Sequence, residues 1–160
     1  MLNKKENIKY IVIDVDGTLT DGTINISDRG ELYKSFYCRD GLAIIDAREK
    51  GIKSIILTSR NSEIVSIRAN EIGITDVLQN AGKNKSIELT DYCKRNKIDF
   101  SQVAYIGDDR NDIEAMKLCS IIGCPYDAIN DVKEIADFIS SHSGGRGAVR
   151  EFIDWLLYAK

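Results

Sequence analysis

The stretch that decides the fold is Tyr10-Ile11-Val12-Ile13-Asp14-Val15-Asp16-Gly17-Thr18. Its first four residues are all β-branched or aromatic, which is typical of a strand buried on both faces of a parallel sheet. The run then gives way to two carboxylates and a glycine, so the chain is expected to turn sharply where the strand stops. In open parallel sheets, ligands bind beyond the carboxyl ends of the strands. This stretch therefore predicts a buried parallel strand and the edge of the sheet that carries a site.

Apolar runs of the same kind recur downstream and alternate with helical patterns. Strands are predicted over residues 52–57, 76–78, 103–106 and 121–122, and helices over residues 42–50, 63–72, 85–97 and 112–118. This alternation predicts a doubly wound, Rossmann-like α/β fold with a parallel sheet. The length of 160 residues suits a single domain, residues 1–160.

Two segments depart from the alternation. Strand-like runs over residues 23–27 and 32–37 flank Asp28-Arg29-Gly30, which predicts a β-hairpin flap after the first strand. Near the other end, Gly144-Gly145-Arg146-Gly147 predicts a flexible joint. An amphipathic helix is expected after it, with its apolar face formed by Val149, Phe152, Ile153, Leu156 and Leu157.

Composition limits the classes of partner. The net charge of −3 gives no general attraction to nucleic acid or anionic lipid, so an anionic ligand must be held by a local site. The N-terminal apolar run is too short for a signal peptide or a membrane span. We expect a cytoplasmic protein without nucleic-acid or membrane partners, whose scattered cysteines are buried thiols: Cys38, Cys93, Cys119 and Cys124.

Polar residues follow four of the predicted strands. They are Asp14 and Asp16 after the first, Thr58-Ser59-Arg60 after the second, Lys85 at the start of the helix after the third, and Gly107-Asp108-Asp109 after the fourth. Carboxylates with one lysine and one hydroxyl suit a phosphorylated substrate held with a hard cation such as Mg²⁺. Asp14 and Asp108 are the expected metal ligands, while Lys85 and Thr58 hold phosphate oxygens.

The two carboxylates of the first motif have different expected roles. Asp14 attacks phosphorus and forms an aspartyl phosphate. Asp16 protonates the departing alkoxide and later deprotonates the water that hydrolyses the intermediate.

Three charged residues have more than one interpretation. Arg60 and Arg68 lie about two helical turns apart and are expected to share a face near the pocket mouth, although a surface salt bridge is the alternative for Arg68. Asp112 is assigned to the first turn of its helix, with a supporting role at the metal as the lesser alternative.

These elements resemble the four motifs of the haloacid dehalogenase superfamily, and the resemblance spans nearly the whole chain. It implies that the backbone carbonyl of Asp16 also ligates the metal and that Asp109 supports the site beside Asp108. Within the superfamily, three further segments resemble the 3-deoxy-D-manno-octulosonate 8-phosphate phosphatases. These are Thr20-Asp21-Gly22, Arg39-Asp40-Gly41 and Gly144-Gly145-Arg146-Gly147-Ala148-Val149-Arg150-Glu151.

This branch implies a small anionic sugar-phosphate substrate, an ulosonate 8-phosphate, and a place in lipopolysaccharide biosynthesis. Phosphatases for nine-carbon ulosonate 9-phosphates and regulatory partners of sugar cytidylyltransferases are the alternatives within it. Arg60, Arg68 and Arg146, together with Ser59, are the candidate substrate-binding residues. Ser59 stands where the group has glycine, and the loop before Lys85 is longer than usual, which makes Lys83 a rival for the phosphate lysine.

The order of the motifs argues against a phosphorylatable receiver module, whose acceptor aspartate follows a later strand. The segments between motifs leave no room for the inserted cap domain that many relatives carry. We therefore expect a homotetramer in which a neighbouring subunit covers the cleft, through the hairpin or through the segment around Arg146.

Overall fold

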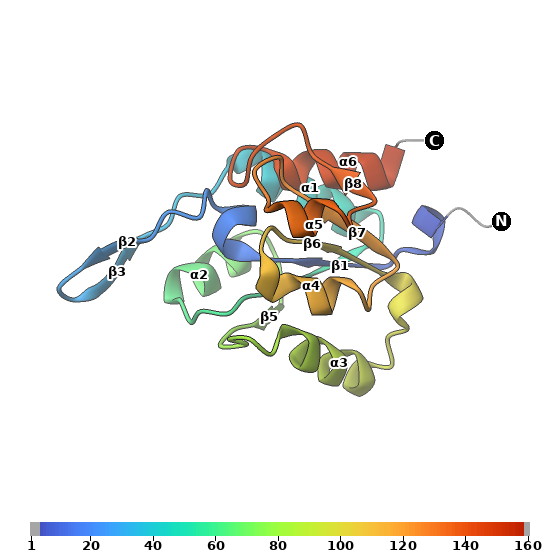
Figure 1. The fold of residues 1–160 in the computed structure, drawn as a ribbon, viewed down its shortest axis with the longest axis horizontal. Helices are drawn as coiled ribbons and strands as arrows, with labels where there is room; N and C mark the ends of the chain where they lie inside the picture. The colour runs from blue at the N-terminus through green and yellow to red at the C-terminus, as the bar shows by residue number, and fades with distance from the viewer. Residues whose placement is uncertain (1–3, 159–160) are drawn as a thin grey trace.

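A six-stranded sheet, parallel throughout, forms the centre of the computed structural model, which describes residues 4–158 (Figure 1). The strand order is β5-β4-β1-β6-β7-β8, so the chain starts in the middle and winds outward in both directions. The strands are β1 (Tyr10–Ile13), β4 (Lys53–Leu57), β5 (Asp76–Leu78), β6 (Val103–Ile106), β7 (Ile121–Cys124) and β8 (Phe138–Ile139). The predicted doubly wound α/β fold is confirmed.

Helices cover both faces of this sheet. One apolar core joins it to α1 (Cys38–Glu49), α2 (Glu63–Glu71) and α6 (Ala148–Tyr158). The other joins it to α3 (Lys85–Asn96), α4 (Arg110–Met116) and α5 (Asn130–Lys133). Because side chains alternate along a strand, Ile11 and Ile13 of β1 enter the first core and Val12 the second. Short 3₁₀ turns, η1 (Lys4–Asn7) and η3 (Phe100–Gln102), precede β1 and β6.

The central strand delivers the first motif to the edge of the sheet. β1 pairs with β4 on one side and β6 on the other, and its three last residues are fully buried. The chain then makes an irregular helical turn, η2 (Val15–Leu19), in which Gly17 has φ +95°. A Cβ at Gly17 would lie 2.1 Å from Asp108 Oδ2, so only glycine permits both this turn and the close approach of the two loops.

The predicted hairpin is present as β2 (Asn25–Ser27) and β3 (Gly30–Tyr33), and it extends away from the body of the molecule (Figure 1). Its second strand is shorter than predicted, because pairing stops at Tyr33 and residues 34–37 lead unpaired into α1. Large apolar side chains on the ribbon face solvent, including Ile26 at 67% and Leu32 at 59% exposure.

Two local predictions are wrong. Residues 144–147 are not a flexible joint, because Gly144 and Gly145 are buried against the turn that follows β1. Cys38 is exposed at the start of α1, whereas the sequence suggested a buried thiol. The two-residue strand β8 and the single turn of α5 were not anticipated, since elements this short carry no periodicity.

Element ends shifted modestly. α1 begins at Cys38 rather than Leu42, and α4 begins at Arg110 rather than Asp112. Within the described residues, none of the helices is both long and apolar enough to cross a bilayer.

Candidate active site

A buried lysine links two loops at the carboxyl edge of the sheet. Asp14 follows β1, Lys85 is the first residue of α3, and Asp112 lies in the first turn of α4. Lys85 Nζ lies 2.5 Å from Asp14 Oδ1 and 2.7 Å from Asp112 Oδ1. The Lys85 side chain is only 1% exposed, so its charge is held in place by the two carboxylates.

Asp14, Asp108 and Asp112 form a cluster of carboxylates whose oxygens lie within 4.8 Å of one another. Asp112 accepts hydrogen bonds from the Tyr105 hydroxyl at 2.7 Å and from the backbone N–H groups of Asp108 and Asp109 at 3.2 and 3.3 Å. From the sequence, Asp112 was predicted to lie in the first turn of its helix, with a supporting role at the metal site as the lesser alternative. The structure places it in both positions, because the capping box of α4 turns Asp112 back toward the site.

The electrostatics of the cluster favour a bound cation. Burial raises the pKa of Asp14 well above its usual range, the charge of Asp112 raises it further, and Lys85 opposes both effects. Burial and Asp112 also raise the pKa of Asp108 to about 6. Lys85 thus pairs with two of the three carboxylates, Asp14 and Asp112. Oxygen ligands in this arrangement, without a thiolate or an imidazole, suit Mg²⁺.

Asp16 points to a different set of partners. Its Oδ1 accepts a hydrogen bond from Lys34 Nζ at 2.5 Å, and its Oδ2 lies 3.9 Å from Arg60 Nε. Lys34 comes from the chain that leaves the hairpin, and its Nζ also lies 3.0 Å from Glu31 Oε1. No pattern in the sequence indicates a site role for Lys34, because only tertiary structure brings the end of the hairpin to the first motif.

The loop after β4 contributes two buried or half-buried residues. Thr58 is 2% exposed directly after the strand. The Ser59 hydroxyl donates to the Gly82 carbonyl at 2.6 Å and accepts from Asn111 Nδ2 at 2.9 Å, so it links the loop after β4 to Gly82 and to α4. Lys83 is exposed and lines a surface cavity with Ser59 and Asp109. It is therefore Lys85, and not Lys83, that reaches Asp14.

The predicted arginines are spread out. Arg60 precedes α2, which begins at Glu63, so Arg60 and Arg68 do not share a helical face as expected. Arg68 pairs with Glu71 at 2.7 Å, the surface salt bridge that was its alternative. Arg146 is 69% exposed, and its guanidinium lies 4.0 Å from Asp21 Oδ2. Of the three, Arg60 is the one in contact with an acidic residue of the first motif.

Asp109 contributes through the helix that follows it. It is the N-cap of α4, and its carboxylate accepts a hydrogen bond from the Arg110 N–H at 2.7 Å. Asp109 is exposed and lies outside the carboxylate cluster. Its support of the site is therefore to begin the helix that carries Asp112.

The glycine-rich segment before α6 packs on the first motif. The Gly145 N–H donates to the Thr18 carbonyl at 3.0 Å, and the Gly144 N–H donates to Asp127 Oδ1 at 2.9 Å. A Cβ at Gly144 would lie 1.9 Å from the Gly17 carbonyl oxygen. This segment therefore buttresses the turn that presents Asp16.

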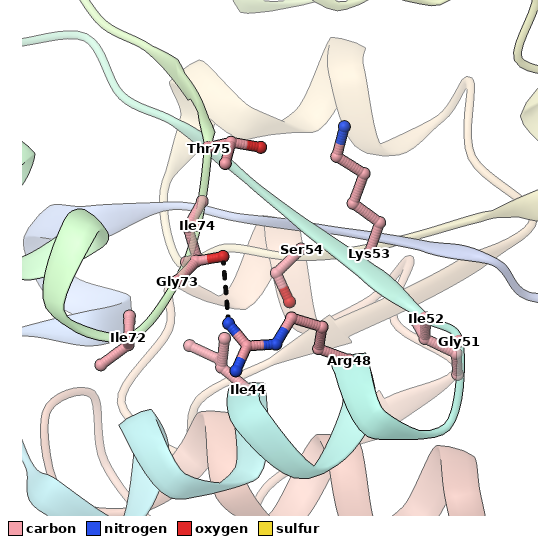
Figure 2. A pocket seen from close by; sticks show the side chains of 10 residues that line it. All are labelled: Ile44, Arg48, Gly51, Ile52, Lys53, Ser54, Ile72, Gly73, Ile74 and Thr75. Carbon is pink, nitrogen blue, oxygen red and sulfur yellow. Dashed lines mark hydrogen bonds between the residues drawn. The ribbon is translucent and has the colours of Figure 1, made fainter.

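A second hollow, of about 330 Å³, lies at the other end of β4 (Figure 2). Figure 2 shows Arg48 reaching across it from α1 to the Gly73 carbonyl, at a distance of 3.5 Å. Its lining residues are Ile44, Arg48, Gly51, Ile52, Lys53, Ser54, Ile72, Gly73, Ile74 and Thr75. None of them belongs to a motif described above, so this hollow is separate from the carboxylate cluster.

Comparison with known sequences gives a consistent set of relatives. A family model described as haloacid dehalogenase-like hydrolase matches residues 57–153. The 3-deoxy-D-manno-octulosonate 8-phosphate phosphatase KdsC of Haemophilus influenzae is 39% identical over 100% of this chain and 88% of its own length. KdsC of Escherichia coli strain K12 is 38% identical over 100% of this chain and 85% of its own.

Solved structures agree with the sequence comparison. The cobalt-bound deoxy-D-mannose-octulosonate 8-phosphate phosphatase of Haemophilus influenzae superposes with a TM-score of 0.92 at 37% identity, covering 97% of this chain and 90% of that one. The phosphatase of Moraxella catarrhalis, in complex with a magnesium ion, a phosphate ion and a KDO molecule, gives 0.93 at 35% identity, with 98% and 90% covered.

Proposed function

Because this chain belongs to the haloacid dehalogenase-like hydrolase family, we propose that it is a magnesium-dependent phosphatase acting on 3-deoxy-D-manno-octulosonate 8-phosphate. The observation that carries the proposal is the position of Asp14 at the end of the central strand, within the carboxylate cluster and against the buried Lys85. The relatives that match the whole chain are phosphatases, which makes this protein a phosphoric monoester hydrolase.

In the proposed reaction, Asp14 attacks the phosphorus atom. Because Lys85 engages Oδ1, the other oxygen of Asp14 is the one available to form the new bond to phosphorus. The bond between phosphorus and the substrate oxygen breaks, and Lys85 and Thr58 steady the phosphate oxygens. A magnesium ion held by Asp14, Asp108 and the Asp16 carbonyl would offset the repulsion between the attacking carboxylate and the phosphate.

Asp16 handles the protons in both halves of the reaction. It gives a proton to the departing alkoxide and then takes one from the water that attacks the aspartyl phosphate. Inorganic phosphate leaves and Asp14 is restored. The buttress from residues 144–147 holds the turn that carries Asp16 while these steps occur.

The identity of the sugar rests on the relatives. Several of them, from different bacteria, bear the name of the octulosonate 8-phosphate phosphatase, and one was solved with KDO and phosphate. Arg60 beside Asp16 offers a cation for an acidic sugar. One alternative is a nine-carbon ulosonate 9-phosphate as substrate. The other is a regulatory role beside a sugar cytidylyltransferase, and the intact motif residues disfavour this second alternative.

A substrate panel tests this assignment. Phosphate release is measured with eight-carbon and nine-carbon ulosonate phosphates and with ordinary hexose phosphates. The proposal expects the highest kcat/KM for the octulosonate 8-phosphate. Equal kcat/KM across the panel would refute the assigned substrate, and absence of turnover on every ester would refute the assigned phosphatase activity.

We also propose that residues 1–160 act as one domain within a homotetramer. The exposed apolar side chains of the hairpin support this, because an isolated two-stranded ribbon is marginal in water and gains from packing. We assign the protein to the cytoplasm, where its four free cysteines remain reduced.

A further inference from the structure

Lys34 has an environment unlike that of a surface lysine. It follows β3 at the base of an exposed hairpin, yet its side chain is only 3% exposed. Its ammonium lies 2.5 Å from Asp16 Oδ1 and 3.0 Å from Glu31 Oε1. No step of the proposed reaction uses Lys34, although it touches the residue that moves the protons.

We propose that Lys34 is a positioning residue that orients Asp16 for proton transfer to the leaving group. This inference rests on the proposed function. A carboxylate that acts as acid and base must present one oxygen to the reacting atom in a fixed direction. Lys34 engages Oδ1, which leaves Oδ2 to face the side of the turn where Arg60 lies at 3.9 Å. Without Lys34, the carboxyl group would be free to rotate about its χ angles.

Glu31 makes this arrangement sustainable through the reaction cycle. When Asp16 holds a proton, a buried ammonium with no other partner would be strongly unfavourable. Glu31 Oε1 lies 3.0 Å from Lys34 Nζ and gives that charge a second carboxylate partner. Glu31 itself accepts a hydrogen bond from the Ser62 hydroxyl, and Ser62 is the N-cap of α2. The positioning group is thus anchored to a helix of the body.

The hairpin therefore contributes to the site of its own chain, in addition to the subunit contact proposed above. Glu31 and Lys34 both come from the second half of the hairpin segment and reach the site of their own chain. A purely structural role for Lys34, holding the hairpin against the body, would affect every substrate equally. A role through Asp16 affects the step that releases the leaving group only where that group needs a proton, whereas hydrolysis of the aspartyl phosphate is common to all substrates. The two cases are therefore separated by kcat/KM, which reports the reaction up to release of the leaving group.

The test compares two esters with different leaving groups. The octulosonate 8-phosphate releases an alkoxide that must be protonated, whereas p-nitrophenyl phosphate releases a stable phenolate that need not be. We expect Lys34→Met to lower kcat/KM on the sugar ester by about 10- to 100-fold and kcat/KM on the aryl ester by less than about 3-fold. Lys34→Arg, which keeps the charge and the donors, is expected to recover part of the loss.

Coupling to Asp16 provides the second readout. Asp16→Asn is expected to show the same preference for the aryl ester, and the double variant is expected to be no slower than Asp16→Asn alone. Lys9→Met, at an exposed lysine before β1, is the matched control, and thermal melts establish that each variant is folded.

The outcomes distinguish this inference from the proposed function. Equal losses on both esters, additive effects in the double variant, or no loss at all would overturn the role of Lys34. A wild type that cleaves the aryl ester but not the octulosonate ester would refute the substrate alone, and Lys34 would then be tested on an alkyl phosphate from the panel that is cleaved. A wild type inert on every ester would refute the proposed function.

Discussion

Asp14 and Lys85 depend on each other for their charge states. Burial alone would lower the pKa of Lys85, but Asp14 and Asp112 outweigh it and raise that pKa. Lys85 in turn opposes the rise in the pKa of Asp14. Lys85 therefore favours the ionised form of Asp14 against a net rise in its pKa, and the cluster in turn secures the charge of Lys85.

Replacing the nucleophile tests this assignment directly. Asp14→Asn is expected to lower phosphate release by at least about a thousandfold, because an amide oxygen cannot form the acyl phosphate. The fold should survive, since Lys85 keeps Asp112 as a partner at 2.7 Å. Asp91→Asn, at an exposed position on α3, is the control. Near-normal turnover, after deamidation and contaminating phosphatase are excluded, would rule out the covalent route.

Asp40 gives a pH-dependent prediction away from the metal cluster. It is 1% exposed, and burial raises its pKa to about 6. Hydrogen bonds from the backbone N–H groups of Arg150 and Gly147 act in the opposite direction but are outweighed. The folded state therefore binds more protons than the unfolded state between pH 4 and 6, and the free energy of unfolding falls as pH rises through this window. In Asp40→Asn this contribution is absent.

Urea unfolding at several pH values measures the effect. The stability of the wild type relative to Asp40→Asn is expected to fall by about 2 kcal/mol from pH 4 to pH 7. Asp28→Asn, in the exposed hairpin turn, should show no such trend. Parallel pH profiles for the wild type and Asp40→Asn would contradict the raised pKa.

Some residues of the site are predictable from sequence and others are not. Asp14, Thr58 and Asp108 stand where continuous apolar runs stop, and the carboxyl ends of parallel strands necessarily meet at one edge. Asp112 and Lys34 reach the site through a helix cap and the base of a hairpin. The capping box that directs Asp112 is local, and a site role for Asp112 was the lesser of the two alternatives predicted from the sequence. The position of Lys34 depends on packing between distant segments, which no local pattern records.

At the scale of elements, the segment before α6 shows the same limit. Its glycines were interpreted as a flexible joint, because sequence does not distinguish glycine required for freedom from glycine required for close approach. The structure shows the second case at Gly144, which packs on Gly17. Five of the six strands of the central sheet were predicted, whereas β8 and this contact were not.

Adding one methyl group at Gly144 tests that contact. Gly144→Ala would place a carbon 1.9 Å from the Gly17 carbonyl oxygen, so one of the two loops must move. We expect a loss of about 1–3 kcal/mol in stability and a clear fall in kcat, because the turn carrying Asp16 shifts. Ser143→Ala is the neighbouring control. Unchanged kcat and melting temperature would show that the two loops are not tightly coupled.

The hairpin carries the prediction about assembly. Leu32 is 59% exposed on a ribbon that extends from the body (Figure 1), and burial between subunits of the proposed tetramer would account for its apolar side chain. Leu32→Lys is expected to dissociate the tetramer into smaller species in light scattering. Ile87→Lys, at a 57% exposed residue of α3, should leave the mass unchanged. A tetramer that persists in Leu32→Lys, or a wild-type monomer, would contradict this interface.

At the scale of the whole molecule, the carboxylate cluster links metal binding to stability. Mg²⁺ that binds the folded state alone raises its free energy of unfolding, by about 2.7 kcal/mol at a hundredfold excess over Kd. We expect added Mg²⁺ to raise the melting temperature by several degrees, and EDTA to stop turnover reversibly.

Asp108→Asn separates this effect from general salt stabilisation. It removes one carboxylate of the cluster and should abolish most of the thermal shift, while K⁺ at equal ionic strength should produce none. Full activity after exhaustive chelation would refute the metal requirement.

The contact between residues 144–145 and the first motif has a consequence for how the protein is made. A ribosome synthesises β1 and its catalytic turn early, but the glycines that brace this turn emerge more than a hundred residues later. Strands β1, β4 and β6 can pair before then. The growing chain can thus acquire most of its sheet while this turn is still unbraced, so we expect the candidate site to form late in translation.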